Sequence, residues 1–454
     1  MTNLELGYMS FPVLLLLIFL RAPIGLAMLM CGIGGLWMVI GTPNMFLAKL
    51  KTETYTTFSS YSLTIIPMFL LMGQFATLSG MSTSLFKAAE SWLGHRKGGV
   101  AMAAVGACAG FGAICGSSLA TAATMSRVAL PELKRYGYSG GFSTATLAAG
   151  GTLGILIPPS VILVIYAIIV EQDVGKLLLA GFIPGVFSAI VYAALIIGLA
   201  LTMKNFGPPV SGFTWRQRFE ALPPALPIFA VVVIIIFFVY NPFGGDAWGT
   251  PTEGGAIGAF IVLLMALWRG MRWPELKDAL IETAKLSVMI FSIIWGVLIY
   301  VRFLGFADLP TAFSDWITSL DYPPMLILIC ILLAYAVLGM FMDAIGMLLL
   351  TLPVVYPAVM ALNGGEAVTA AESTFGMSGT MCAVWFGILV VKMAEFCLIT
   401  PPIGLNCFVV AGVRPDLSVQ DVFRGVLPFF FADAVTIALL VAFPSIVLWL
   451  PSLA

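Results

Sequence analysis

Two proline pairs interrupt apolar segments of this chain, and both interruptions are flanked by residues that can offer oxygen atoms to a ligand. One pair lies in the segment 154–160, Gly-Ile-Leu-Ile-Pro-Pro-Ser, and the other in the segment 397–403, Cys-Leu-Ile-Thr-Pro-Pro-Ile. Proline removes a backbone donor and clashes with the preceding turn, so each pair should interrupt a helix. Inside hydrocarbon, freed carbonyl groups are tolerated only where protein, water or an ion satisfies them. Both interruptions are therefore candidate binding sites.

The first proline pair is accompanied by small and hydroxyl-bearing residues. Hydroxyl oxygens can coordinate a hard cation or hydrogen-bond an anion, and small residues let backbones approach closely. The candidate residues here are Gly116, Ser117, Ser118, Thr121, Gly150, Gly151, Thr152 and Ser160. A glycine inside a helix lowers helix stability by about 1 kcal/mol relative to alanine. The several glycines of the tract 148–154 therefore indicate a structural or functional requirement. The tract either unwinds to expose carbonyl oxygens or packs closely against other helices.

The second proline pair is accompanied by an acid and an amide. The candidate residues here are Gly339, Asp343, Thr400, Pro401 and Asn406. An acid within a membrane costs roughly 2.5–3.5 kcal/mol on insertion scales and commonly faces a cavity, a partner or an ion. Asp343 is therefore a candidate sodium ligand. Helix capping is the alternative, because aspartate is a common N-cap residue.

Three more charged residues lie within apolar segments. Lys392 and Glu395 are spaced i and i+3, hence on one helical face, and we expect them to neutralise each other near the second interruption. Arg127 is a candidate anchor for an acidic substrate, because arginine suits bidentate recognition of a carboxylate. Alternatively, its side chain extends to the cytoplasmic interface.

The elements that must position these residues are membrane-spanning helices. Of the 454 residues, 61% are hydrophobic and 9% are charged, whereas a soluble domain carries roughly 25% charged residues. About 20 residues span a bilayer as a helix, and apolar runs of this order recur over 9–40, 221–240, 254–268 and 425–442. The composition predicts an all-α polytopic membrane protein.

The same composition excludes several classes of function. No polar stretch is long enough for a soluble recognition domain, so such a domain must belong to another polypeptide. The net charge of −1 gives no indication of nucleic-acid binding. The single histidine, His95, rules out the H-E-x-x-H zinc motif. We therefore expect no enzyme and no cofactor, with the 7 cysteines acting as small buried hydrophobic residues.

Lysine and arginine predict how the chain crosses the membrane. With both termini in the periplasm, most basic residues fall inside, as the positive-inside rule requires. The basic residues that then fall outside are Lys49, Lys51, Lys176 and Arg302. In this arrangement, the apolar segment 100–130 starts and ends on the same side of the membrane, and so does the segment 323–357. We therefore expect two re-entrant hairpins, with tips at 115–118 and 339–343. The alternative is that both segments are plain spans.

Each predicted hairpin carries a Leu-Pro exit, Leu130-Pro131 or Leu352-Pro353, and is followed by a broken helix, over 140–172 or 379–411. One unit enters from inside and the other from outside, which is an inverted repeat and a common pointer to a transporter's binding site. The predicted divisions are N-terminal scaffold helices 1–99, a first transport unit 100–185, scaffold helices 186–322, a second transport unit 323–424 and a C-terminal helix 425–454.

The motifs resemble one family. The runs 116–133 (Gly-Ser-Ser-Leu-Ala-Thr-Ala-Ala-Thr-Met-Ser-Arg-Val-Ala-Leu-Pro-Glu-Leu), 148–160 and 392–406 are similar to the large membrane subunit of TRAP transporters. The resemblance extends over essentially the whole chain. Ser126 stands where glycine is usual and Phe396-Cys397 where Ile-Gly is usual, which could alter helix packing slightly.

The resemblance implies a tripartite secondary transporter that is coupled to sodium and hydrolyses no ATP. A periplasmic substrate-binding protein would deliver a small organic anion, and a small four-helix membrane subunit would support this one among the lipids of the bacterial inner membrane. The fold would be of the elevator type, with the hairpins and broken helices moving against a scaffold. Dicarboxylates, keto acids, sugar acids and sulfonates are all compatible substrates.

Carried over to these positions, the resemblance implies two groups of sodium-binding residues with the substrate between them. The first group is Ser117, Ser118, Gly150, Gly151 and Thr152, and the second is Gly339, Asp343, Thr400, Pro401 and Asn406. The candidate substrate contacts are Gly116, Thr121, Arg127, Ser160 and Asn406. The alternative function is a stand-alone sodium/organic-anion symporter without a binding protein; a membrane enzyme and a channel are more distant alternatives.

Overall fold

The described part of the chain is helical and contains no strand, which confirms the all-α prediction. The computed structural model describes residues 2–202, 207–210, 213–240, 248–414 and 416–453, so the predicted divisions 1–99, 186–322, 323–424 and 425–454 each include residues outside this description. The helices are α1 Asn3–Phe19, α2 Ile24–Ile40, α3 Pro43–Phe58, α4 Ile65–Leu78, α5 Met81–Leu93, α6 Gly99–Cys115, α7 Ser118–Arg135, α8 Gly140–Thr152, α9 Val161–Ile169, α10 Val174–Thr202, α11 Trp215–Ala221, α12 Leu226–Tyr240, α13 Pro251–Trp268, α14 Trp273–Phe306, α15 Leu309–Thr318, α16 Pro324–Gly339, α17 Ala344–Asn363, α18 Gly379–Leu398, α19 Leu405–Val413, α20 Val419–Ala442 and α21 Ser445–Leu448, with 3-10 turns at Tyr61–Thr64, Leu153–Ile155 and Pro451–Leu453.

The chain is a multi-pass membrane protein by the length and apolar character of its helices. Within the described residues, 7 helices are long and apolar enough to cross a bilayer, and up to 8 if the bent pair α11 and α12 forms one span. Roughly 20 apolar residues are needed for one crossing. Several of the shorter apolar helices, such as α6 and α16, belong to hairpins that change direction before completing such a length.

The long helix α14 packs along α2 through glycines. A Cβ atom on Gly25 would lie 2.8 Å from Ile293 Cα, and one on Gly32 would lie 2.8 Å from Tyr300 N. Small residues allow this approach of backbone to backbone, which is a common way for membrane helices to associate. The helices α4 and α13 form a second extensive contact beside them.

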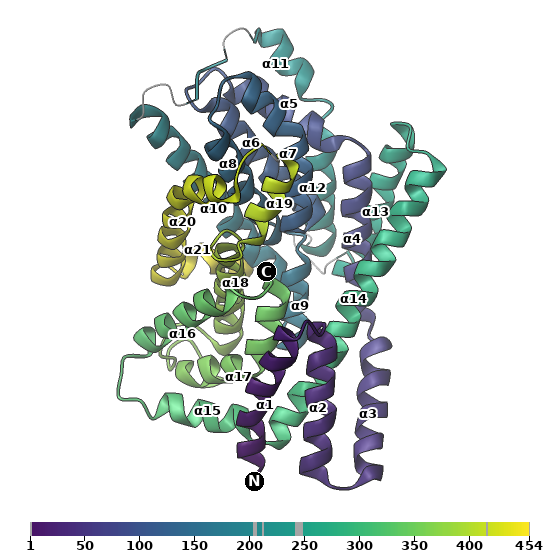
Figure 1. Ribbon diagram of the computed structural model, residues 1–454, viewed down its shortest axis with the longest axis vertical. Coiled ribbons are helices and arrows are strands. Elements are labelled where there is room, and N and C mark those ends of the chain that lie inside the picture. Colours follow the sequence, from purple (N-terminus) through teal and green to yellow (C-terminus); the bar gives the residue numbers. More distant parts are fainter. Residues whose placement is uncertain (1, 203–206, 211–212, 241–247, 415, 454) are drawn as a thin grey trace.

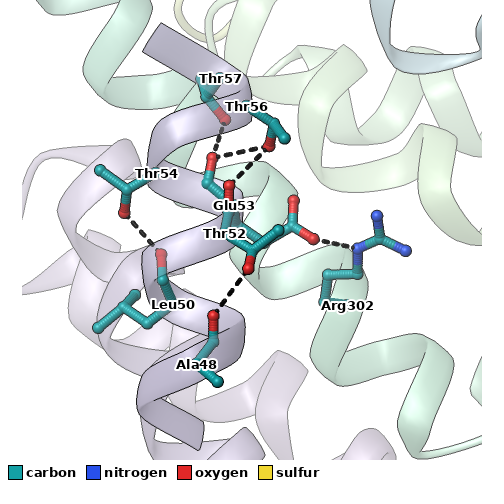
Figure 2. A network of polar contacts seen from close by, with 8 residues as sticks. All are labelled: Ala48, Leu50, Thr52, Glu53, Thr54, Thr56, Thr57 and Arg302. Atoms are coloured by element: carbon teal, nitrogen blue, oxygen red, sulfur yellow. Dashed lines mark hydrogen bonds and ion pairs between the residues drawn. The ribbon is translucent and has the colours of Figure 1, made fainter. Parts of the chain in front are cut away.

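The helix α3 is polar and is tied to α14 by an ion pair. Its hydroxyls at Thr52, Thr54 and Thr57 donate to backbone carbonyl oxygens one turn earlier, so the helix satisfies its own polar side chains (Figure 2). Glu53 Oε1 lies 2.6 Å from Arg302 Nε, which belongs to α14 (Figure 2). This pair joins the second half of α3 to the longest described helix.

Two helical hairpins lie in opposite halves of the molecule. The pair α6 and α7 occupies the half that holds α5 and α11, and the pair α16 and α17 occupies the half that holds α1 and α15 (Figure 1). α6 ends at Cys115 and α16 at Gly339, which are the predicted tips. The placement of these hairpins in a membrane, and with it the inverted repeat, stays a prediction.

The second arm of each hairpin continues through its Leu-Pro step, so the prediction of an exit from the helix there is wrong. Pro131 lies inside α7, which runs to Arg135, and Pro353 lies inside α17, which runs to Asn363. A helix-internal proline removes one hydrogen bond, and in membrane helices neighbouring helices and local adjustments compensate for it. α7 packs against α6 and α8, and α17 packs against α15 and α18. These contacts keep both arms intact.

Cysteine labelling is expected to place residues 134 and 367 on opposite sides of the membrane. Both positions are exposed, so a cysteine introduced at either would be accessible. In a background lacking Cys330, which is the exposed cysteine of the described residues, Ala367→Cys should react with an impermeant maleimide in intact cells. Lys134→Cys should react only after the cells are opened. Labelling of Lys134→Cys from outside would contradict the first re-entrant hairpin.

Candidate functional site

The first interruption is organised by a buried serine. The helix α8 gives way to a 3-10 turn at Leu153, and α9 begins at Val161. The Ser160 hydroxyl donates to the Ile155 carbonyl oxygen and accepts a hydrogen bond from Leu163 N at 3.4 Å. It therefore satisfies an acceptor inside the break and caps α9. The peptide bond between the two prolines is cis here and in the second interruption.

The tip of the first hairpin rests on this interruption. Gly116 has a φ of 61°, a conformation that favours glycine, and a Cβ atom there would lie 2.8 Å from the Pro159 carbonyl oxygen. Ser117 caps α7 by accepting a hydrogen bond from Ala120 N at 3.4 Å, and Ser118 is buried. The hairpin tip and the first proline pair thus lie in direct contact.

The glycines before the first proline pair are packing residues in a continuous helix. Gly150, Gly151 and Thr152 all belong to α8. A Cβ atom on Gly151 would stand 2.6 Å from Ala122 Cβ on the hairpin arm α7. The close-packing interpretation therefore holds for this part of the tract, and the helix becomes irregular only from Leu153 onward.

The buried hydroxyl of Thr121 lies where the hairpin arm α7 meets the chain at Gly154. A Cβ atom on Gly154 would lie 2.8 Å from Thr121 Oγ1. The Cys115 thiol faces the same hydroxyl, but within the described chain no well-directed hydrogen bond reaches Thr121 Oγ1, and the same is true of the buried Ser126 hydroxyl. Buried hydroxyls are normally hydrogen-bonded. These two oxygens are therefore free to bind a ligand or a water molecule.

The second interruption begins at the end of α18. Thr400 Oγ1 donates to the Phe396 carbonyl oxygen at 2.6 Å, which closes the last turn. Pro401 is exposed. Gly404 has a φ of 51° and stands directly before α19, where a Cβ atom would lie 2.7 Å from the Phe423 ring. Glycine is favoured here by both the backbone angle and the close aromatic neighbour.

The tip of the second hairpin packs against the end of α18. A Cβ atom on Gly339 would lie 2.6 Å from Cys397 Cβ. Asp343 caps α17 by accepting a hydrogen bond from Gly346 N at 3.1 Å. The capping alternative for Asp343 is therefore observed, and the carboxylate is only partly buried. Its role as a sodium ligand stays a prediction.

The two interruptions meet through Asn406. Its Nδ2 donates to the Ala148 carbonyl oxygen at 3.0 Å, a contact between residues 258 positions apart. The side chain is fully buried, and its Oδ1 has no hydrogen-bond partner in the described residues. Helix α19 packs against α7 and α8, while α9 packs against α17 and α18. The second half of each broken helix thus lies against the opposite unit.

Within the described residues, two candidate residues are not joined to this junction by a hydrogen bond or an ion pair. No hydrogen bond or ion pair of the described residues joins the Asp343 carboxylate to Asn406. Arg127 is exposed on α7, about 14 Å along the helix from Ser118 at 1.5 Å per residue. It lines a cleft together with Lys87, Glu90, Glu132 and Arg135. Its position in this charged cleft favours the interfacial alternative.

Burial raises the pKa of Glu90 in this cleft, against a smaller lowering by a hydrogen bond from Tyr136. A carboxyl that resists ionisation contributes less negative charge.

Lys392 and Glu395 lie in contact as expected, with Nζ 2.6 Å from Glu395 Oε2. Sequence reasoning missed a third member: Asp433 on α20 lies with its Oδ1 2.7 Å from the same Nζ. All three side chains are fully buried. The available signal was an acid inside the apolar run 425–442, which is the criterion that singled out Asp343.

Comparison of the sequence with known proteins identifies the family. The family model for the DctM component of tripartite ATP-independent periplasmic transporters matches residues 11–446. The chain belongs to this family. The C4-dicarboxylate TRAP transporter large permease protein DctM of Pseudomonas aeruginosa is 31% identical over 421 residues, covering 92% of each chain. The isethionate TRAP transporter permease protein DctMQ of Oleidesulfovibrio alaskensis is 26% identical, covering 93% of this chain and 62% of that protein.

A solved structure shares the fold of this DctM component. The YdaH transporter of Alcanivorax borkumensis superposes with a TM-score of 0.57 at 14% sequence identity, covering 88% of each chain. At this identity the likeness concerns the fold alone. Membership of the DctM family implies a substrate-binding protein and a small membrane subunit as partners. The relatives are transporter permeases, so the chain is a transport subunit and not an enzyme.

Proposed function

We propose that this permease subunit imports a small organic anion together with sodium ions through the junction of its two interruptions. A periplasmic substrate-binding protein delivers the anion, and the small subunit supports the permease in the bacterial inner membrane, with both termini of this chain periplasmic. The C4-dicarboxylate and isethionate relatives support this substrate class by their names, because both compounds are small anions.

The contact between Asn406 and Ala148 is the observation that carries the proposal. It joins the second broken helix to the first and leaves Asn406 Oδ1 unpartnered in the interior. Thr121 Oγ1 is a second buried oxygen without a described hydrogen bond. Hydroxyl, amide and backbone oxygens are the ligands that a hard cation such as sodium prefers. These atoms supply such ligands close to the points where the chain leaves helical geometry.

Helix ends support the anionic part of the proposal. The two interruptions are followed by the N-termini of α9 and α19, and the two hairpin tips by the N-termini of α7 and α17. The N-terminus of a helix carries partial positive charge and free N–H groups, which favour an anion. Sodium on the oxygens and the anion near the helix ends would occupy adjacent volumes, so that binding of one assists the other. We further propose that the hairpins and broken helices move together against a scaffold formed by α2, α4, α13 and α14.

Reconstitution tests this function. In proteoliposomes that contain both membrane subunits, uptake of a labelled C4-dicarboxylate or of isethionate should require an inward sodium gradient and the binding protein. ATP should have no effect. The matched controls are the same vesicles with potassium in place of sodium, and vesicles without the binding protein. Robust sodium-driven uptake by this chain alone would instead support the stand-alone symporter.

Replacing Asp343 separates its two possible roles. Asp343→Asn keeps a good N-cap residue, whereas Asp343→Ala removes the cap at a cost of about 1 kcal/mol. If the carboxylate binds sodium, both variants should lose sodium-dependent uptake, and only Asp343→Ala should also lose thermal stability. Unchanged sodium dependence in Asp343→Asn would leave capping as the sole role of this residue.

A further inference from the structure

The cluster of Lys392, Glu395 and Asp433 carries one more acid than base. Lys392 Nζ lies 2.6 Å from Glu395 Oε2 and 2.7 Å from Asp433 Oδ1, and the three side chains have no solvent exposure. If both acids were ionised, one full negative charge would remain in the interior. An uncompensated buried charge is so unfavourable that a carboxyl group in this position normally takes up a proton instead.

The groups around Glu395 do not supply the missing positive charge. The titratable groups that face it are Lys392 on its own helix, Asp433 from α20 and Tyr192 from α10. Among the other helices that pack against α18, Thr152 of α8 faces the Tyr192 hydroxyl and donates to the Ala149 carbonyl oxygen, but it carries no charge. The remaining polar groups are engaged elsewhere: Tyr166 of α9 donates to the Ala383 carbonyl oxygen, Tyr335 of α16 bonds Thr351 of α17, Tyr356 of α17 bonds Gln172, and Cys407 of α19 contacts the Ile399 carbonyl oxygen.

The surroundings of the two acids differ. Tyr192 is fully buried, its ring lies 5.8 Å from Lys392 Nζ, and its hydroxyl faces Asp433 without a well-directed hydrogen bond to any described residue. This hydroxyl can donate to an ionised Asp433. Glu395 Oε1 and Asp433 Oδ2 are both buried, and no donor of the described residues reaches either, while the contact of Asp433 Oδ1 with Lys392 Nζ is short but poorly directed. The Tyr192 hydroxyl is therefore the group that favours an ionised Asp433 over an ionised Glu395.

A metal ion fits this cluster poorly. Lys392 Nζ already stands between the two carboxylates, so a metal cation would lie close to an ammonium group. Among the described residues, no group of three or more His, Cys, Asp or Glu side chains could hold a metal ion. A proton needs one oxygen and no coordination sphere, and Glu395 Oε1 offers that oxygen.

We propose that Glu395 is a proton-binding site, which holds one proton taken from water while Lys392 and Asp433 form an ion pair. Glu395 lies in the last turn of α18, directly before the second interruption. Release of the proton would leave an unbalanced carboxylate at the contact of α18 with α20. Alkaline conditions should therefore loosen the support of the second interruption. This inference does not rest on the proposed sodium coupling.

Infrared spectroscopy of the purified full chain in detergent, with thermal melting beside it, tests this proposal. At about pH 7, a range in which ordinary carboxyls are ionised, the wild type should show a protonated carboxyl band that Glu395→Gln loses. Asp433→Asn should lose it as well, because Glu395 can then ionise beside Lys392. Labelling the glutamate carboxyls of the wild type with 13C should shift the band, whereas labelling the aspartate carboxyls should not. The melting temperature of the wild type should fall as the pH rises from about 5, because the unfolded carboxyl ionises there while folded Glu395 keeps its proton, and the fall should end where Glu395 itself ionises. The melting temperature of Glu395→Gln should not show this fall, because its amide cannot ionise. Glu366→Gln, at an exposed position, is the control and should match the wild type in both measurements.

The opposite results would overturn the proposal. A band that persists in Glu395→Gln, or no band in the wild type, would show that Glu395 is ionised. A melting temperature that rises with sodium chloride but not potassium chloride in the wild type, and in neither salt in Glu395→Gln, would assign a sodium ion to this position instead. If Glu395→Gln yields no folded protein, the wild type labelled with 13C in its glutamate carboxyls decides the matter, since its band should shift.

Discussion

Asn406→Ala is expected to reduce the initial rate of substrate uptake by roughly 10- to 100-fold, because an unsatisfied buried acceptor costs about 1–3 kcal/mol. The substitution removes the amide that donates to the Ala148 carbonyl oxygen and joins the two interruptions. It also removes Oδ1, a buried oxygen proposed to face the ligands. The measurement is sodium-driven uptake into proteoliposomes with both partner proteins, at several sodium concentrations.

Asn363→Ala is the matched control for this prediction. Asn363 is also fully buried, donates to the Met377 carbonyl oxygen at 3.1 Å and accepts from Phe375 N at 3.2 Å. Both bonds lie within one loop, far from the interruptions in the chain. Asn363→Ala should therefore lower thermal stability while leaving the sodium dependence of uptake unchanged. If both variants lost uptake equally at equal amounts of protein, Asn406 would have only a structural role and no direct part in binding the ligands.

Lys392→Met is expected to destabilise the protein by about 3–5 kcal/mol, the usual result of removing one partner from a buried ion pair. The variant leaves Glu395 and Asp433 facing each other without a cation in a region with no solvent exposure. Methionine has a similar length and fills the same space, so the loss would be electrostatic. The measurement is thermal unfolding of the detergent-solubilised chain, together with the yield of folded protein.

Neutralising the acids should rescue this variant. With Glu395→Gln and Asp433→Asn added, the cluster carries no charge, and stability should return to near that of the wild type, since replacing a whole buried ionic group is often tolerated. Lys285→Met is the control for the loss of a lysine, because Lys285 is exposed and lies 4.0 Å from Glu282. It should change stability by less than about 1 kcal/mol. Failure of the triple variant to recover would show that the cluster stabilises through its specific geometry.

The proline pairs and the tips were predictable because their causes are local. A Pro-Pro step removes donors from its own helix, and glycines such as Gly116 and Gly404 adopt φ values of 61° and 51° that favour this residue. The single prolines Pro131 and Pro353 were misjudged because their effect is decided by neighbours. Each of these prolines removes one backbone hydrogen bond, but the helices packed beside it compensate for the loss, so the helix continues.

The functions of the acids were harder to predict, because charge alone does not identify a partner. Asp343 and Asp433 both stand in apolar segments. In the structure Asp343 caps its own helix, a local role, whereas Asp433 meets Lys392 from another helix. The spacing of Lys392 and Glu395 revealed one pair, since i and i+3 share a face. Nothing in that spacing indicates a third charge brought by α20.

By itself, the sequence determined the helical class, the interruptions and the family, because composition, proline chemistry and long motifs act along the chain. Only the tertiary structure decided that Asn406 reaches Ala148, that the glycines before the first proline pair are packing residues and that Lys392 lies between two acids. Each of these depends on contacts between helices far apart in the chain. Periodicity predicts which face a residue occupies, and the packing of whole helices decides what that face meets.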